Sequence, residues 1–77
     1  MDIDDVFDII NKADENDRIE IYVNSKPTII HKTKDEFDVD RLSEILVVKS
    51  GDEKATTVIN VPYIRFIKIL QPDQDDQ

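Results

Sequence analysis

Residues 55–70 read ATTVINVPYIRFIKIL, and the fold of the chain is predicted from this stretch. Two short runs, 55–60 and 64–70, are rich in β-branched and aromatic side chains, which favour β-strands. Only Val61, Pro62 and Tyr63 separate them. Proline lacks a backbone N–H and holds the preceding residue in an extended conformation, so Pro62 should interrupt strand pairing here. We therefore predict a sharp corner between two strands, within a strongly bent sheet that curls toward a small barrel.

The length and composition indicate one small domain. A chain of 77 residues has a core that is marginal without a partner. It contains no cysteine, so neither a disulfide nor a thiolate metal site can stabilise it. No apolar run reaches the roughly 18 residues of a membrane span, and the N-terminus is acidic where a signal peptide is basic. We expect a cytoplasmic protein, not associated with a membrane, that gains buried area by forming a homo-oligomer.

The formal net charge is −8, which argues against nucleic acid as a partner, because phosphate contacts need lysine and arginine. The charge is unevenly distributed, however. Residues 1–20 carry eight acids and two bases, and residues 71–77 carry three acids. Residues 21–70 carry seven acids and eight bases. The acidic excess therefore lies at the two ends, and the predicted β-domain between them is close to neutral.

The N-terminal part of the chain predicts one helix, over residues 2–13. Asp2 is a suitable N-cap for this helix. Its apolar residues at helical spacing are Ile3, Val6, Phe7 and Ile10. We expect this stripe to pack on the sheet, and the alternative is a docking surface for another protein.

Strands are predicted over 18–23, 28–33 and 44–50, in addition to the two runs described above. Residues 34–43 fit either a long loop anchored on the core or a bent continuation of the strands. The hairpin turn expected near residues 50–53 contains Gly51, the single glycine, which should supply a positive φ. Residues 71–77 (QPDQDDQ) should form a disordered acidic tail. The predicted fold is therefore one mainly-β domain over residues 1–70, with an N-terminal helix and a five-stranded, strongly bent, SH3-like small barrel.

Residues 44–70 resemble the Sm-like family (LSm and Hfq-type proteins). The resemblance lies in a strand EILVVKS, a hairpin at Gly51, a strand TTVIN, a tight VPY connection and a strand RFIKIL. A short helix followed by five bent strands is also the layout of this family. The resemblance implies a ring of six or seven copies, in which the fourth strand of one subunit pairs with the fifth strand of the next. It also implies that a face or rim of the ring binds single-stranded RNA.

The turn between the last two strands is one place where the resemblance implies RNA contacts. The candidate residues there are Asn60, Tyr63 and Arg65. Tyr63 could stack on a base and Arg65 could meet a phosphate. Each residue also has a purely structural interpretation: Asn60 as a turn residue, Tyr63 as an aromatic packed on the end of the barrel, and Arg65 as a solvated charge.

No catalytic constellation is recognisable in the sequence. His31 is the single histidine, and no nucleophile or orienting carboxylate is placed beside it by spacing. Asp35, Asp38 and Asp40 are close in sequence but lack the glycine and the terminal glutamate of an EF-hand. We therefore predict a protein that is not an enzyme and has no cofactor or metal. The alternative to an RNA-binding ring is a protein-interaction module with an acidic docking surface; a different SH3-like barrel fits the same strand pattern.

Overall fold

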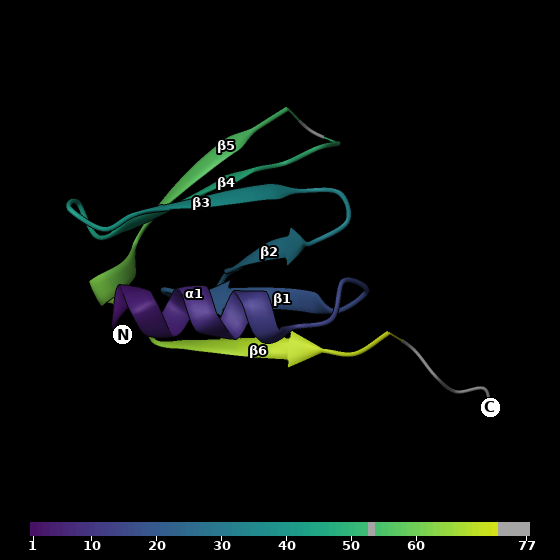
Figure 1. The fold of residues 1–77 in the computed structure, drawn as a ribbon, viewed down its shortest axis with the longest axis horizontal. Helices are drawn as coiled ribbons and strands as arrows, with labels where there is room; N and C mark the ends of the chain where they lie inside the picture. The colour runs from purple at the N-terminus through teal and green to yellow at the C-terminus, as the bar shows by residue number, and fades with distance from the viewer. Residues whose placement is uncertain (53, 73–77) are drawn as a thin grey trace.

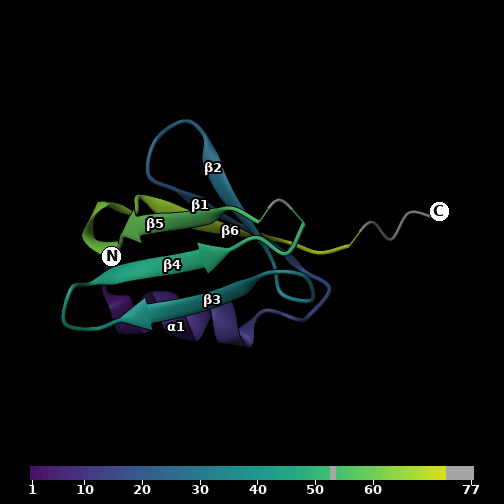
Figure 2. The ribbon, with the colours of Figure 1, turned by 90° about the horizontal axis from the view of Figure 1, so that it is seen from above.

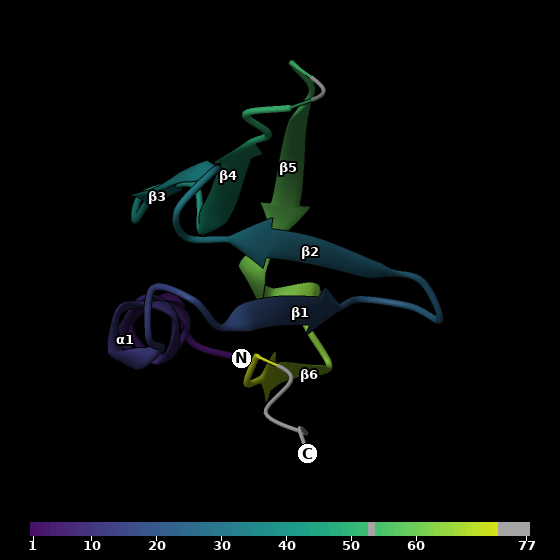
Figure 3. The ribbon, with the colours of Figure 1, turned by 90° about the vertical axis from the view of Figure 1, so that its right-hand side faces the viewer.

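The structure is a computed structural model, and it describes residues 1–52 and 54–72. The elements follow in the order α1 (Ile3–Lys12), β1 (Arg18–Tyr22), β2 (Pro27–His31), β3 (Glu36–Asp40), β4 (Ile45–Lys49), β5 (Thr56–Asn60), the 3-10 turn η1 (Val61–Tyr63) and β6 (Phe66–Leu70). The described strands form two three-stranded antiparallel sheets, ordered β2-β1-β6 and β3-β4-β5. In Figure 3 the second sheet stands above β2 of the first.

The coarse prediction, a mainly-β domain with an N-terminal helix, is confirmed. Two details are wrong: the described chain has six strands instead of five, and these strands do not close into a barrel. The additional strand is β3. It lies within residues 34–43, for which the sequence allowed either a long loop or a bent continuation of the strands. The reason is a tight turn after β2, in which the backbone N–H groups of Lys34 and Asp35 donate to the His31 carbonyl oxygen, at 3.0 and 2.8 Å. This turn ends β2, and the chain then enters the other sheet.

The predicted helix is confirmed, with bounds one residue shorter at each end. Ile3, Val6 and Ile10 are buried. Asp2 occupies the N-cap position with an extended backbone, but its side chain makes no capping hydrogen bond. Figures 2 and 3 show α1 beneath β3, where the Phe7 ring lies 6.4 Å from the ring of β3 residue Phe37.

A lysine from the β2–β3 turn fixes the other end of α1. The Nζ of Lys32 donates to the carbonyl oxygens of Asn11 and Ala13, at 3.2 and 2.7 Å. The last carbonyl groups of a helix lack partners within the helix and carry partial negative charge, so an ammonium group is favourable there. The contact therefore ties the helix to the turn that separates β2 from β3.

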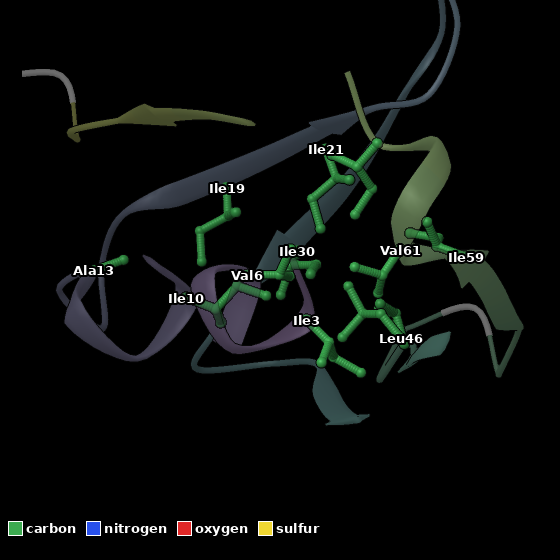
Figure 4. Packing of buried hydrophobic residues seen from close by; sticks show 12 residues of the cluster. Ile3, Val6, Ile10, Ala13, Ile19, Ile21, Ile30, Leu46, Ile59 and Val61 are labelled. Carbon is green, nitrogen blue, oxygen red and sulfur yellow. The ribbon is translucent and has the colours of Figure 1, made fainter. Parts of the chain in front are cut away.

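One core holds the helix and both sheets together. Its fully buried side chains are Val6, Ile10, Ile19, Ile21, Ile30, Leu46 and Val61 (Figure 4). Burial of one such aliphatic side chain contributes about 1.5–3 kcal/mol. Because the described sheets share no strand pairing, this common core is what keeps one sheet on the other.

The predicted corner between the last two strands connects the two sheets. The chain leaves β5 at Asn60, passes through η1 and enters β6 on the opposite side of the molecule (Figure 1). Val61 is fully buried, and its N–H donates to the Glu44 carbonyl oxygen at 2.9 Å. The Ile64 N–H donates to the Val61 carbonyl oxygen at 3.0 Å and ends the turn. Pro62 therefore lies in a helical turn between strands, where its missing N–H costs no ladder hydrogen bond.

The prediction that Gly51 adopts a positive φ is wrong, because no glycine does so in the structure. Glycine is required for close packing instead: a Cβ at this position would overlap the carbonyl oxygen of Lys34. The Asp35 carboxylate holds the same two turns together. It accepts the N–H of His31 at 2.9 Å and the N–H of Gly51 at 3.1 Å.

Gly51→Ala is therefore expected to destabilise the fold by about 1–3 kcal/mol, as overpacking does when backbone must move. Urea unfolding followed by circular dichroism measures this change. Asp52→Ala, in the same exposed turn, is the matched control and should change the free energy of unfolding by less than about 0.5 kcal/mol. Equal stability of the Gly51→Ala variant and the original chain would show that the two turns are not packed in this way.

Candidate functional site

A groove lies between the edge strands β2 and β5 in the described structure. It has two lobes, and Thr28 of β2 and Thr57 of β5 line both. The first lobe, of about 240 Å³, is also lined by Val23, Asn24, Lys26, Asn60 and Tyr63. The second, of about 460 Å³, is also lined by Ile29, His31, Asp35, Val48 and Ala55. The groove is thus a long open channel along two strand edges, without the enclosure typical of a small-molecule site.

The structure brings two of the three predicted RNA-contacting residues together. Asn60 and Tyr63 line the first lobe, and the Tyr63 side chain is 67% exposed. Arg65 is also exposed but does not line the groove, and its backbone N–H donates to the Tyr22 carbonyl oxygen at 2.7 Å. The cation in the lobe is Lys26, from the β1–β2 turn.

The sequence did not single out Lys26, which lies between the strands predicted over 18–23 and 28–33. The turn is stabilised locally, since Asn24 Oδ1 accepts the backbone N–H of Lys26 at 2.9 Å. Pro27 then begins β2. No signal within residues 24–27 indicates that this turn lies near Tyr63, because that proximity depends on the packing of the two sheets.

The outer face of the β2-β1-β6 sheet carries a second group of polar and aromatic side chains. Glu20 on β1 is buried there, and its Oε2 accepts hydrogen bonds from Arg18 Nε at 3.0 Å and Nη2 at 2.5 Å. The Tyr22 hydroxyl donates to Glu20 Oε1 at 3.0 Å. The ring of Tyr22 stacks on Phe66 with 4.5 Å between centroids, and Lys68 Nζ lies 5.8 Å from the Tyr22 centroid.

These contacts change the acidity of both groups. The hydrogen bond from Arg18, followed by that from Tyr22, lowers the pKa of Glu20 below its ordinary value of 4.5. The hydrogen bond to the Glu20 carboxylate raises the pKa of Tyr22 above its ordinary value of 10.0. Glu20 is therefore ionised near neutral pH, and its neighbours stabilise the charged form.

The four edge strands differ in how many backbone groups they leave open. On β3, the Val39 N–H is taken by the carboxylate of Asp38 at 3.1 Å. On β2, Pro27 has no N–H, and the N–H and carbonyl of His31 are taken by residues of the following turn. Charged and proline residues of this kind block the addition of another strand. Across the described residues, β5 and β6 contain no proline, and no side chain bonds to their outward-facing backbone groups, although β6 carries Lys68.

Acidic side chains also gather on two other elements, α1 and β3. We call the exposed carboxylates of α1 and β3 the acidic surface: Asp4, Asp5, Asp8, Glu36, Asp38 and Asp40. The two elements adjoin, because Arg41, just after β3, pairs with Asp4 and lies over the Phe7 ring at 5.9 Å. The acidic surface therefore extends over two adjoining elements, a helix and an edge strand.

The described residues present no arrangement that suggests metal or acid–base chemistry. His31 is exposed, and its backbone, not its imidazole, makes the contacts described above. Asp35, Asp38 and Asp40 each accept nearby backbone N–H groups: Asp35 and Asp40 in turns, and Asp38 within β3. Within residues 1–52 and 54–72, no group of three or more histidine, aspartate or glutamate side chains could hold a metal ion.

Comparison with protein-family models, with curated proteins and with solved structures finds no match for the chain. Among the described residues, no helix combines the length and apolar composition needed to cross a membrane. What the chain does must therefore be inferred from its groove, its strand edges and its surface charge.

The lowered pKa of Glu20 leads to a test of its hydrogen bonds with Arg18 and Tyr22. A carboxylate with a lowered pKa stabilises the folded state above its ordinary pKa, and this contribution is lost as the pH falls through the lowered value. Glu20→Gln should therefore unfold at lower urea concentration than the original chain at pH 7, and the difference should shrink below about pH 4.5.

Asp8→Asn, which changes an exposed carboxylate of α1, is the control for the loss of one negative charge. A difference between Glu20→Gln and the original chain that is constant from pH 7 to acid would contradict the assigned hydrogen bonds.

Proposed function

We propose that this chain is a non-enzymatic, Sm-like assembly module, whose copies join β5 to β6 and together bind single-stranded RNA beside Tyr63. The observation that supports assembly most strongly is the contrast between edges. β2 and β3 are blocked, whereas β5 and β6 are open in the described structure. Figure 1 places β5 and β6 at opposite sides of the molecule, so that one copy can present each edge to a different neighbour.

Exposed apolar side chains on the same two strands also favour association. Val58 on β5 is 58% exposed, and Ile69 on β6 is 39% exposed. Ile69 is notable because its register partner on β1, Ile19, is fully buried. Other side chains of the same copy therefore cover this face of β6 only in part. A neighbour that pairs with the strand would supply the missing cover.

The topology is compatible with the Sm-like resemblance. If β2 and β3 are counted as the two halves of one strand interrupted by the turn after His31, the order becomes a helix followed by five strands. The last two of these are then β5 and β6, the strands that pair between subunits in that family. Pairing of two different edges is heterologous, and it closes into a ring when the rotation between neighbours permits.

The RNA part of the proposal rests on Tyr63 and the cations near it. An aromatic ring that is largely exposed can stack on an unpaired base, and lysine or arginine beside it can contact phosphate. Lys26 lines the lobe with Tyr63, and Arg65 lies two residues further along the chain.

A second candidate function is favoured by the acidic surface. Six exposed carboxylates on adjoining elements, with Arg41 paired to one of them, would attract a basic protein and repel nucleic acid. In this case the module would still assemble, but its partner would be a cationic protein. The RNA-binding assay below separates the two functions.

Val58→Pro tests the assembly. Because the Val58 N–H faces away from β4, proline should preserve the fold and remove an edge donor. We expect the original chain to sediment as an oligomer and Val58→Pro as a folded monomer. Val58→Thr keeps both the N–H and the β-branched shape, and should still assemble. A monomeric original chain, or a Val58→Pro variant that assembles normally, would contradict the proposal.

Tyr63→Ala tests the RNA contact. The original chain should bind a fluorescein-labelled single-stranded RNA of random sequence, with affinity that decreases as salt increases. Loss of one stacked base costs about 1–3 kcal/mol, so the variant should bind about 5- to 150-fold more weakly. Leu42→Ala, at a fully exposed residue that does not line the groove, is the control and should bind normally. Normal assembly without RNA binding at low salt would favour the cationic-protein partner.

A further inference from the structure

The outer face of the β2-β1-β6 sheet carries a group of exposed apolar side chains. The strand register places Ile29, Phe66 and Leu70 on this face, because each is paired with an outer-face residue of β1. Their exposed fractions are 38, 42 and 41%, and the edge position of β2 also exposes Ile29 to the groove. Apolar side chains grouped on one face are typical of an interaction surface, whereas single exposed ones are ordinary.

The helix and the other sheet both lie on the opposite, inner face of this sheet. The common core joins α1 and the β3-β4-β5 sheet to the inner-face residues Ile19, Ile21 and Ile30, which are fully buried (Figure 4). Compact domains consist of layers of secondary structure that cover one another's apolar faces. The described part of one copy therefore leaves the outer face without a covering layer.

The exposed charges of β1 and β6 on this face are positive. Their one carboxylate there, on Glu20, is 6% exposed and is bonded to Arg18 and Tyr22. The Arg18 side chain remains 49% exposed, and its Nη1 forms no hydrogen bond with a described residue. Lys68 is exposed over the Tyr22 ring, and no described carboxylate forms an ion pair with it. Two cations of this face can therefore pair with carboxylates of a partner.

These side chains are ordered before a partner binds. The carboxylate of Glu20 holds Arg18 and Tyr22, and the Tyr22 ring stacks on Phe66 with 4.5 Å between centroids. Because each flexible side chain that an interface immobilises costs about 0.5–1.5 kcal/mol, an ordered surface loses less on binding. Tyrosine and arginine are also enriched among the residues that contribute most to protein–protein affinity.

The geometry of the face favours a helix as its occupant. The face consists of side chains, so a segment that lies on it must satisfy its own backbone hydrogen bonds, as a helix does. Three strands spaced about 4.8 Å apart form a face about 10 Å wide, which is the diameter of one helix. The five-residue strands are about 17 Å long, which matches about three helical turns.

We propose that the outer face of the β2-β1-β6 sheet binds an acidic amphipathic helix of another protein. The apolar stripe of that helix packs on Ile29, Phe66 and Leu70, and its carboxylates pair with Arg18 and Lys68. Charge complementarity selects an acidic helix over a basic one. This inference goes beyond the proposed function and does not rest on it, because the face binds through side chains, whereas assembly uses the backbone groups of strand edges.

A synthetic peptide tests the proposal directly. The probe is a helical peptide of about 14 residues with leucine at i, i+3, i+4 and i+7, glutamate beside this stripe, and alanine elsewhere. The matched control peptide has lysine in place of each glutamate. At about 0.15 M salt, charges more than about 8 Å apart are largely screened, so the remote acids of the chain have little effect. In nitrogen-15 NMR, the acidic peptide should shift the amides of Ile29, Phe66, Lys68 and Leu70, and the basic one should not.

Substitutions on the face test the two kinds of contact. Lys68→Glu replaces an ion pair with a like-charge pair and should weaken peptide binding about 2- to 30-fold, with Lys68→Gln between. Phe66→Ala removes an aromatic contact and should weaken binding about fivefold or more. Lys49→Glu, which makes the same charge change at an exposed lysine of β4, is the matched control and should bind normally. Circular dichroism checks that each variant is folded.

The outcomes separate this inference from its alternatives. Absence of shifts with about 1 mM acidic peptide, or equal binding by folded Lys68→Glu, would overturn it. Shifts of the same amides by the fluorescein-labelled RNA, with none by the peptide, would assign the face to nucleic acid and also overturn it. Shifts that grow with protein concentration alone would assign the face to a second copy, with the same consequence. Val58→Pro should bind the peptide normally, so failure of assembly leaves this inference standing.

Discussion

The burial of Val61 at the corner between β5 and β6 is the constraint on which the rest of the structure depends. Its side chain is fully buried, and its N–H is bonded to Glu44, so η1 is anchored to the start of β4. The chain therefore passes from one sheet to the other within one turn. Two strands joined so tightly lie in different sheets and cannot pair with each other. β5 and β6 are therefore edge strands of two different sheets, and the corner between them keeps their open edges from pairing with each other.

The other two edge strands, β2 and β3, have outward-facing backbone groups that are blocked. Asp38 occupies the N–H of Val39 on β3, and Pro27 and Asp35 restrict β2. Carboxylates concentrate on α1 and β3, and the Tyr63 end of the groove contains Lys26. The blocked β3 edge therefore carries several exposed carboxylates, whereas no described side chain occupies the outward-facing backbone groups of β5 and β6.

Much of the fold could be predicted from local pattern. The helical stripe of α1 and the corner at Pro62 depend on spacing and on the chemistry of single residues, and both are present in the structure. The turn that separates β2 from β3 was not predictable, because it rests on hydrogen bonds to His31 and on the Asp35 carboxylate reaching Gly51. Gly51 itself was assigned a positive φ because that is the usual reason for glycine in a turn. Its packing against Lys34 involves two distant segments and leaves no trace in the sequence pattern.

The candidate site was predictable only in part, for the same reason. Tyr63 and Asn60 are close in sequence and share a lobe, whereas Lys26 reaches that lobe only through the packing of one sheet on the other. Whether a strand lies at a sheet edge, and whether its backbone groups are blocked there, also depends on the tertiary fold, because it depends on which strands remain unpaired after folding.

Residue-resolved hydrogen exchange tests the central claim, that β5 and β6 are open in one copy and paired between copies. The amide protons of Val58, Ile67 and Ile69 should exchange rapidly in dilute solution and become protected as the protein concentration increases. The Thr57 amide, which faces β4, should be protected at every concentration. Rapid exchange of the three edge amides at all concentrations, with Thr57 protected, would contradict the account.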